Sequence, residues 1–162
     1  MAHCNASSHG DTVAPLVVIG VGNEVMRDDG VGTCVVRRLE EENLGPEVEL
    51  VEGAVGGLDL VFDLEGRDLA IIIDAARMGL EPGTVRLVRR EEIEERLLPL
   101  ASLHDIALHD VLELADLTGI RPEIVVVAVE PAEVVPGLGL SPAVEAAVPE
   151  MMRLVMELVG RG

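Results

Sequence analysis

The chain has 162 residues and a formal net charge of −18, because 30 acidic residues outnumber 12 basic ones. This negative charge disfavours nucleic acid and anionic membranes as partners, and no apolar run approaches the length of a membrane span. Apolar residues make up 49% of the chain, yet Phe62 is the only aromatic residue. We therefore expect a core of branched aliphatic side chains, which suits a parallel sheet covered by helices.

We expect residues 1–14 to be a flexible N-terminal tail and residues 15–162 to form one α/β domain. The tail lacks the basic and apolar regions of a signal peptide, which favours a cytoplasmic location. Cys4 and Cys34 are too few for a disulfide framework or a zinc knuckle. Because Cys34 falls on the predicted apolar stripe of the first helix, we interpret it as a buried structural thiol and not as a nucleophile.

Strand and helix patterns alternate along the chain. Strands are predicted at residues 16–19, 48–51, 69–73, 84–88 and 124–129, and helices at 30–43, 58–64, from about 105 onward, and from 142 to about 159. Residues 89–96 are charged and expected to be exposed, and Pro149 is expected to break or kink the start of the last helix. The alternation predicts a three-layer α/β fold: a mostly parallel, twisted sheet of about five strands with helices on both faces, the 69–73 strand central and the 48–51 strand nearer an edge.

The turn after the first strand resembles a dinucleotide-binding turn only in Gly20-x-Gly22. Val25 stands where the third glycine should be, and the helix begins too late for that fingerprint. A phosphate at the helix N-terminus would also meet Asp28 and Asp29, which repel it. A nucleotide-binding α/β protein therefore ranks last among the alternatives, and an acidic turn at a strand end suits a cation better.

Three polar residues fall where separate elements of this fold should converge. Asp29 follows the first strand, Asp74 ends the central strand, and His104 begins a helix. Asp29 reads equally well as a helix N-cap, and two adjacent aspartates allow one to cap while the other faces the cleft. Parallel strands share an edge, so Asp74 should lie on the same side as Asp29.

His104 is expected to be neutral, because a helix N-terminus disfavours imidazolium. His109 belongs to the polar face of the same helix and is interpreted as solvated. Two carboxylates and one imidazole would form an open site for a borderline divalent ion, with nickel or zinc favoured over magnesium.

Several motifs in order along the chain resemble those of the hydrogenase maturation endopeptidases. They are GVGN-x5-DGVG at residues 20–32, IIDA at 72–75, SLHD at 102–105, EP at 130–131 and PGLGLSP at 136–142. The resemblance runs from about residue 16 to residue 159. Some members of the family carry Glu at the position of Asp29, and the shorter carboxylate is expected to alter its reach slightly without changing the chemistry.

The resemblance implies that Asp29, Asp74 and His104 are the metal-contacting residues, and we expect the same three to be the catalytic residues. We expect no separate cofactor-binding residues. The metal is implied to be nickel, already installed in the partner, a nickel–iron hydrogenase large-subunit precursor whose C-terminal extension is removed. We expect other divalent ions such as zinc or cadmium to be able to occupy the site. Asp28 is a candidate base, although a supporting or capping role suits it better. The alternative is a non-catalytic nickel-checkpoint module, and in either case a monomer is expected.

Overall fold

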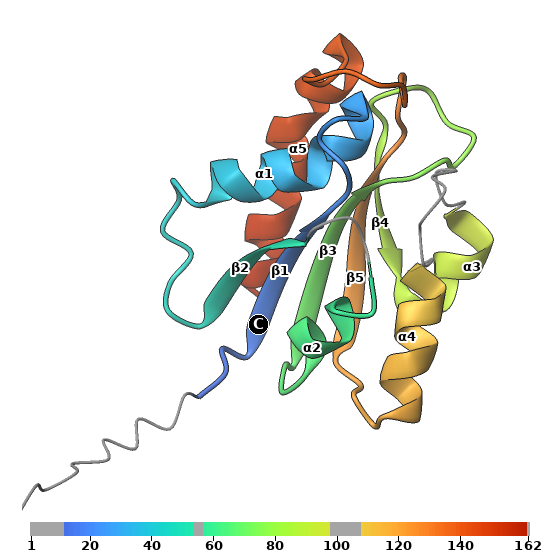
Figure 1. Ribbon diagram of the computed structural model, residues 1–162. Coiled ribbons are helices and arrows are strands. Elements are labelled where there is room, and N and C mark those ends of the chain that lie inside the picture. The colour runs from blue at the N-terminus through green and yellow to red at the C-terminus, as the bar shows by residue number, and fades with distance from the viewer. Residues whose placement is uncertain (1–11, 54–56, 98–107, 162) are drawn as a thin grey trace, which may run out of the picture.

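Five strands form one sheet in the order β2-β1-β3-β5-β4 (Figure 1). The structure is a computed structural model that describes residues 12–53, 57–97 and 108–161. The strands are β1 (Leu16–Val21), β2 (Val48–Gly53), β3 (Leu69–Ala75), β4 (Val85–Arg89) and β5 (Glu123–Val129). β1, β2, β3 and β5 are parallel, and β4 pairs with β5 in the antiparallel direction. The prediction of a mostly parallel sheet is therefore confirmed, with β3 at its centre and β2 at one edge.

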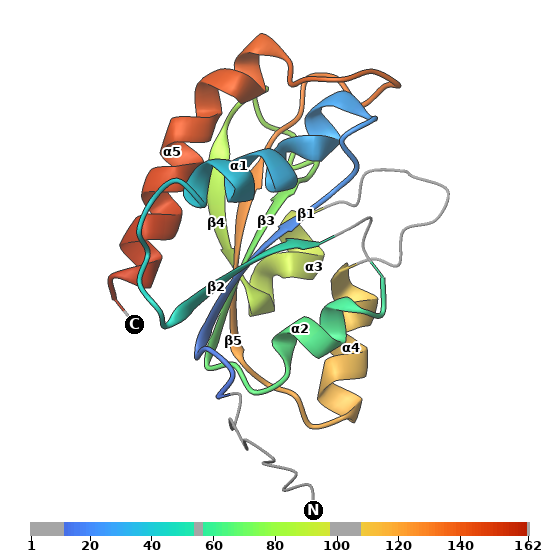
Figure 2. The same ribbon diagram turned by 60° about the vertical axis from the view of Figure 1, so that its left-hand side comes forward.

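Helices cover both faces of this sheet. They are η1 (Arg27–Gly30), α1 (Val31–Leu39), α2 (Leu60–Leu64), η2 (Arg90–Glu92), α3 (Ile93–Arg96), α4 (Leu108–Leu117) and α5 (Pro142–Val159). Figures 1 and 2 show α1 and α5 on one face of the sheet and α2 and α4 on the other. The three-layer arrangement follows from the sequences of the inner strands β1, β3 and β5, which are apolar on both sides.

Alternate residues of the central strand β3 pack into the two halves of the core, one on each face of the sheet. Ile71 and Ile73 of β3 pack with buried residues of α1 and α5, whereas Ile72 packs with those of α2 and α4. All three isoleucines are at most 1% exposed. The core is built from aliphatic side chains, as the composition predicts.

Three local predictions differ from the structure. The first helix ends at Leu39 and not near residue 43, because Leu39 is its last buried side chain and the exposed glutamates that follow form a tight turn. The charged segment 89–96 contains η2 and α3, and its Ile93 is buried against the core. α5 continues unbroken through Pro149, which is exposed, because the buried residues Val148 and Met151 on either side of it hold the helix against the sheet.

Residues 1–11 and 98–107 lie outside the described residues, so the predicted tail and the start of the helix after residue 105 remain predictions. The described part of that helix, α4, begins at Leu108. Within the described residues, no helix is both long and apolar enough to cross a membrane.

Glycines allow α1 to begin directly against the sheet. A Cβ atom on Gly20 would lie 2.2 Å from the carbonyl oxygen of Gly32. A Cβ atom on Gly32 would lie 2.3 Å from the carbonyl oxygen of Val21 and 2.4 Å from that of Ile73. Because the clashing atoms belong to the backbone, no side-chain rotation relieves them.

We expect Gly32→Ala to lower the free energy of unfolding by about 3 kcal/mol, because the added methyl group must push α1 away from the sheet. Urea denaturation of the purified protein measures this change. Gly57→Ala is the matched control, since a Cβ there would meet nothing within 4 Å. Equal stability of the two variants would contradict the close packing of α1 on β1 and β3.

Candidate functional site

The connection from β1 to α1 folds back over the end of its own strand. Gly22 has a φ of +132°, and a Cβ on it would lie 1.7 Å from the carbonyl oxygen of Asp29. Only glycine fits both the dihedral angle and the contact. The turn therefore places Asp29 at the carboxyl end of β1.

Asp29 is half-buried, and one of its oxygens, Oδ2, accepts a hydrogen bond from the backbone N–H of Asn23 at 3.2 Å. The N-cap of α1 is Gly30, and no side chain caps that helix. Neither aspartate of the pair caps α1, so the capping interpretation of Asp29 is wrong.

Asp74 lies on the neighbouring strand at the same edge of the sheet. Gly20 of β1 is paired with Ile73 of β3, and Asp74 comes one position further along β3, where it pairs with Ala128 of β5. Its side chain is half-buried. Because Ile73 faces α1 and α5, strand alternation directs Asp74 to the opposite face, which α2 and α4 cover. Asp29 follows β1 and Asp74 is the next-to-last residue of β3, so both lie at the carboxyl edge of two adjacent parallel strands, as predicted.

His104 lies outside the described residues, so its predicted place beside the two aspartates stays a prediction. Within the described ranges, no three His, Cys, Asp or Glu side chains gather closely enough to hold a metal ion. The nearest described element after His104 in the chain is α4. Its C-terminal end leads to the start of β5, so its N-terminal end, at Leu108, is the end nearer the carboxyl edge of the sheet. His109 is partly exposed and pairs with Glu94 at 2.9 Å and with Glu113 at 3.5 Å, as expected for the polar face of α4.

Asp28 is fully buried although its neighbour Asp29 is not. Its carboxylate accepts hydrogen bonds from the backbone N–H groups of Ala132 and Glu133, both at 2.8 Å. It also accepts bonds from the backbone N–H of Ser141 at 2.7 Å and from the Ser141 hydroxyl at 2.8 Å. A carboxylate enclosed by four donors is not placed to take a proton from water, so Asp28 is not the base.

Glu130 is a second buried carboxylate at this edge, 5% exposed. Its Oε2 accepts hydrogen bonds from the backbone N–H groups of Met78 at 2.6 Å and Leu80 at 3.3 Å, in the turn after β3. Reasoning from the residues alone did not single it out. The Glu130-Pro131 motif was the available signal, but nothing in it indicates burial.

Backbone strain marks the same turn. Arg27 has a φ of +47°, the only positive φ of a non-glycine residue in the described part of the chain. Its N–H donates to the carbonyl of Gly137 at 3.0 Å, and its guanidinium lies 3.5 Å from Glu133. Such strained positions cluster at functional sites, where the surrounding structure compensates for them.

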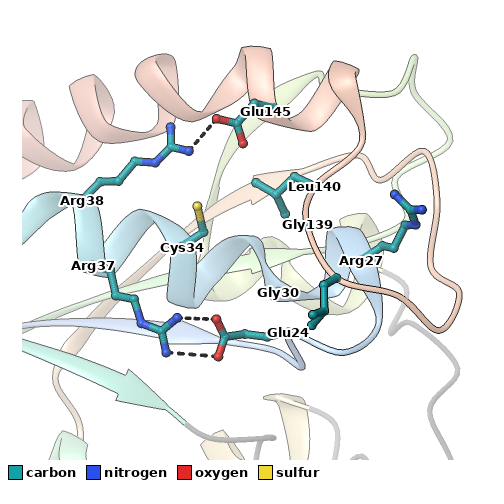
Figure 3. Close-up of a pocket in the computed structure, with 10 residues that line it drawn as sticks. Glu24, Arg27, Gly30, Cys34, Arg37, Arg38, Gly139, Leu140 and Glu145 are labelled. Atoms are coloured by element: carbon teal, nitrogen blue, oxygen red, sulfur yellow. Dashed lines mark hydrogen bonds and ion pairs between the residues drawn. The ribbon is translucent and has the colours of Figure 1, made fainter.

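A groove of about 450 Å³ lies on the α1 side of this turn (Figure 3). Arg37 is paired with Glu24 at one side, Arg38 with Glu145 at the other, and Cys34 lies between them. Cys34 is half-buried, so the prediction that it is a buried core thiol is wrong in that respect. Burial nevertheless raises the pKa of the Cys34 thiol, which argues against a nucleophile, as predicted.

Comparison with known proteins identifies the family. The sequence model of the hydrogenase maturation protease family matches residues 33–158. The chain is 34% identical over 144 residues to the hydrogenase 2 maturation protease of Escherichia coli strain K12, covering 87% of this chain and 88% of that protein. It is 32% identical over 152 residues to the hydrogenase expression/formation protein HoxM of Azotobacter vinelandii, covering 91% and 73%.

Solved structures agree with these sequence matches. The hydrogenase maturating endopeptidase HybD from E. coli superposes with a TM-score of 0.82 at 33% identity, over 90% of this chain and 92% of that one. The chain belongs to the hydrogenase maturation protease family, and its α/β fold is the fold of that family.

We expect Ser141→Ala to lower the free energy of unfolding by about 2 kcal/mol, because it removes a donor to the buried Asp28 carboxylate and the cap of α5. Thermal and urea denaturation measure the change. Thr118→Ala is the control, because that exposed hydroxyl bonds only to neutral carbonyls and its loss should change stability by less than about 0.5 kcal/mol. A Ser141→Ala protein as stable as this control would contradict the network.

Proposed function

We propose that the protein is the endopeptidase that removes the C-terminal extension of a nickel-loaded nickel–iron hydrogenase large-subunit precursor, with the bound nickel as the recognition element. Membership of the maturation protease family supports the reaction class. The main observation that supports this site is that Asp29 and Asp74 are half-buried and lie at the carboxyl ends of adjacent strands. In open α/β sheets, ligands bind at this edge.

The ligand atoms of the three proposed residues suit a nickel ion. Carboxylate oxygens together with one imidazole are ligands that nickel and zinc accept, and we propose His104 as the imidazole. The N–H of Asn23 holds one oxygen of Asp29 and thereby orients the carboxylate, as partners behind metal ligands commonly do. The same donors would accept zinc or cadmium in the absence of the precursor.

In this proposal the nickel belongs to the substrate. Asp29, Asp74 and His104 complete its coordination and so hold the scissile peptide bond at the edge of the sheet. The cation would polarise the carbonyl group of the scissile peptide bond and stabilise the negative charge that develops on its oxygen. Asp28 has no part in proton transfer, because its carboxylate is enclosed by protein donors.

The first test is the intact mass of a large-subunit precursor after incubation with this protein. We expect a C-terminal peptide to be lost from the nickel-loaded precursor and not from the nickel-free one. Cleavage of both forms would keep the enzyme class and overturn the recognition role of nickel. Binding of the loaded precursor without cleavage would favour the non-catalytic checkpoint module.

The second test changes the ligands singly. Asp29→Asn and Asp74→Asn should each lower kcat/KM for the nickel-loaded precursor at least about 100-fold, because an amide oxygen is a weaker ligand than a carboxylate. Asp29→Glu should stay within about tenfold of wild type, because it keeps the carboxylate. Asp59→Asn, at the exposed N-cap position before α2, is the matched control and should cleave normally. Wild-type cleavage by Asp74→Asn would refute the assignment.

A further inference from the structure

Two buried carboxylates, Asp28 and Glu130, have no role in the proposed reaction. They account for two of the four buried polar side chains in the described part of the chain, and a third, Ser141, is a partner of Asp28. A buried charge needs several hydrogen bonds to offset its lost hydration. The positions of those donors therefore show what each carboxylate holds together.

Asp28 joins the turn before Asp29 to the segment that follows β5. Its side chain accepts bonds from Ala132, Glu133 and Ser141, and its own N–H donates to the carbonyl of Glu133 at 3.1 Å. Two further backbone bonds extend the junction. Arg27 donates to Gly137 at 3.0 Å, and Gly137 donates to Val25 at 2.9 Å.

Glu130 joins the same segment to the turn that follows Asp74. Its side chain accepts the N–H groups of Met78 and Leu80. Its backbone extends this contact, since its N–H donates to Thr84 at 2.9 Å and its carbonyl accepts from Gly83 at 2.8 Å. Residues 130–141 thus form hydrogen bonds to residues 27 and 28, directly before Asp29, and to residues 78–84, in the turn that follows Asp74 and the end of β3.

We propose that Asp28 and Glu130 are positioning residues that fix Asp29 and Asp74 relative to each other through the shared segment 130–141. This inference rests on the proposed function of the two aspartates. Asp29 and Asp74 come from different strands, and each stands beside a turn that contacts the same segment. Displacement of either turn strips hydrogen bonds from a buried charge, so the structure resists small shifts of the ligands.

Asp28→Asn and Glu130→Gln test the proposal with little change in side-chain size. Glu133→Gln is the matched control, because it lies on the same segment but its side chain is exposed and pairs only at the surface with Arg27. Amide hydrogen exchange followed by NMR supplies a readout that does not depend on catalysis. Steady-state cleavage of the nickel-loaded precursor supplies the second.

In Asp28→Asn we expect exchange at the Arg27, Asp28 and Gly137 amides to rise at least tenfold. In Glu130→Gln we expect the same at the Met78 and Leu80 amides. Core amides of β3 and β5 should stay within twofold of wild type in both. The Asn23 amide resonance should move in Asp28→Asn, because its proton is bonded to the Asp29 carboxylate.

For cleavage, kcat should fall between about 10- and 100-fold in each variant while KM changes less, because the ligands are displaced and not removed. The control should match wild type in every readout. Wild-type exchange rates and an unmoved Asn23 resonance would overturn the inference, as would raised exchange with wild-type kcat.

Two further outcomes keep the test decisive. If wild type fails to cleave any loaded precursor, the proposed function is refuted, whereas the Asn23 resonance and the exchange rates still decide whether Asp28 positions Asp29. If Asp28→Asn does not fold, Glu130→Gln decides the proposal alone. Its Met78 and Leu80 amides and its kcat must then both change, and either one at the wild-type value overturns it.

Discussion

The backbone of α1 touches the backbone of β1 and β3 with no room for a Cβ atom, and the carboxyl edge of the sheet is arranged around that contact. Gly20 and Gly32 face each other across it, and the carbonyl of Ile73 comes equally close to Gly32. A helix held this near the sheet leaves little space for the connection that precedes it. The chain from Gly22 to Gly30 must therefore fold back over the strand end, where it carries Asp29 next to the end of β1.

Two adjacent aspartates in that connection have different surroundings and hence different roles. Asp28 points into protein and is enclosed by four donors, whereas Asp29 stays half-exposed with one oxygen held by Asn23. The first is suited to hold the fold, since its charge is matched by fixed hydrogen bonds. The second lies half-buried at the end of β1, where we propose that it meets the cation.

A site that binds an ion carried by another protein needs ligands whose positions are fixed before the two proteins meet. Ligands on one chain can adjust around a resident metal, whereas under the proposed function the ligands must meet an ion that another protein already holds. Any freedom in Asp29 or Asp74 would be lost on binding and would weaken recognition. Under that proposal, the hydrogen bonds between residues 130–141 and both flanking turns supply this rigidity within the protein itself.

The fold class and the location of two proposed site residues at the sheet edge could be predicted from the sequence, because they depend on local patterns. Apolar runs identify the buried strands and show which of them is most buried. The carboxyl ends of parallel strands lie at the same edge of the sheet, so Asp29 and Asp74 had to lie at that edge. Three other features could not be predicted from the sequence, because each depends on which neighbour covers the residue. They are the helix end at Leu39, the course of α5 through Pro149 and the half-exposure of Cys34.

The division between Asp28 and Asp29 illustrates the limit most clearly. The sequence by itself determined that two carboxylates follow the first strand and that either one was free to cap a helix. Only the tertiary structure decided that Asp28 bonds to residues more than 100 positions away and that Glu130 reaches the turn after β3. Hydrogen bonds of that kind join segments brought together by the packing of the whole sheet, and no local pattern of residues encodes them.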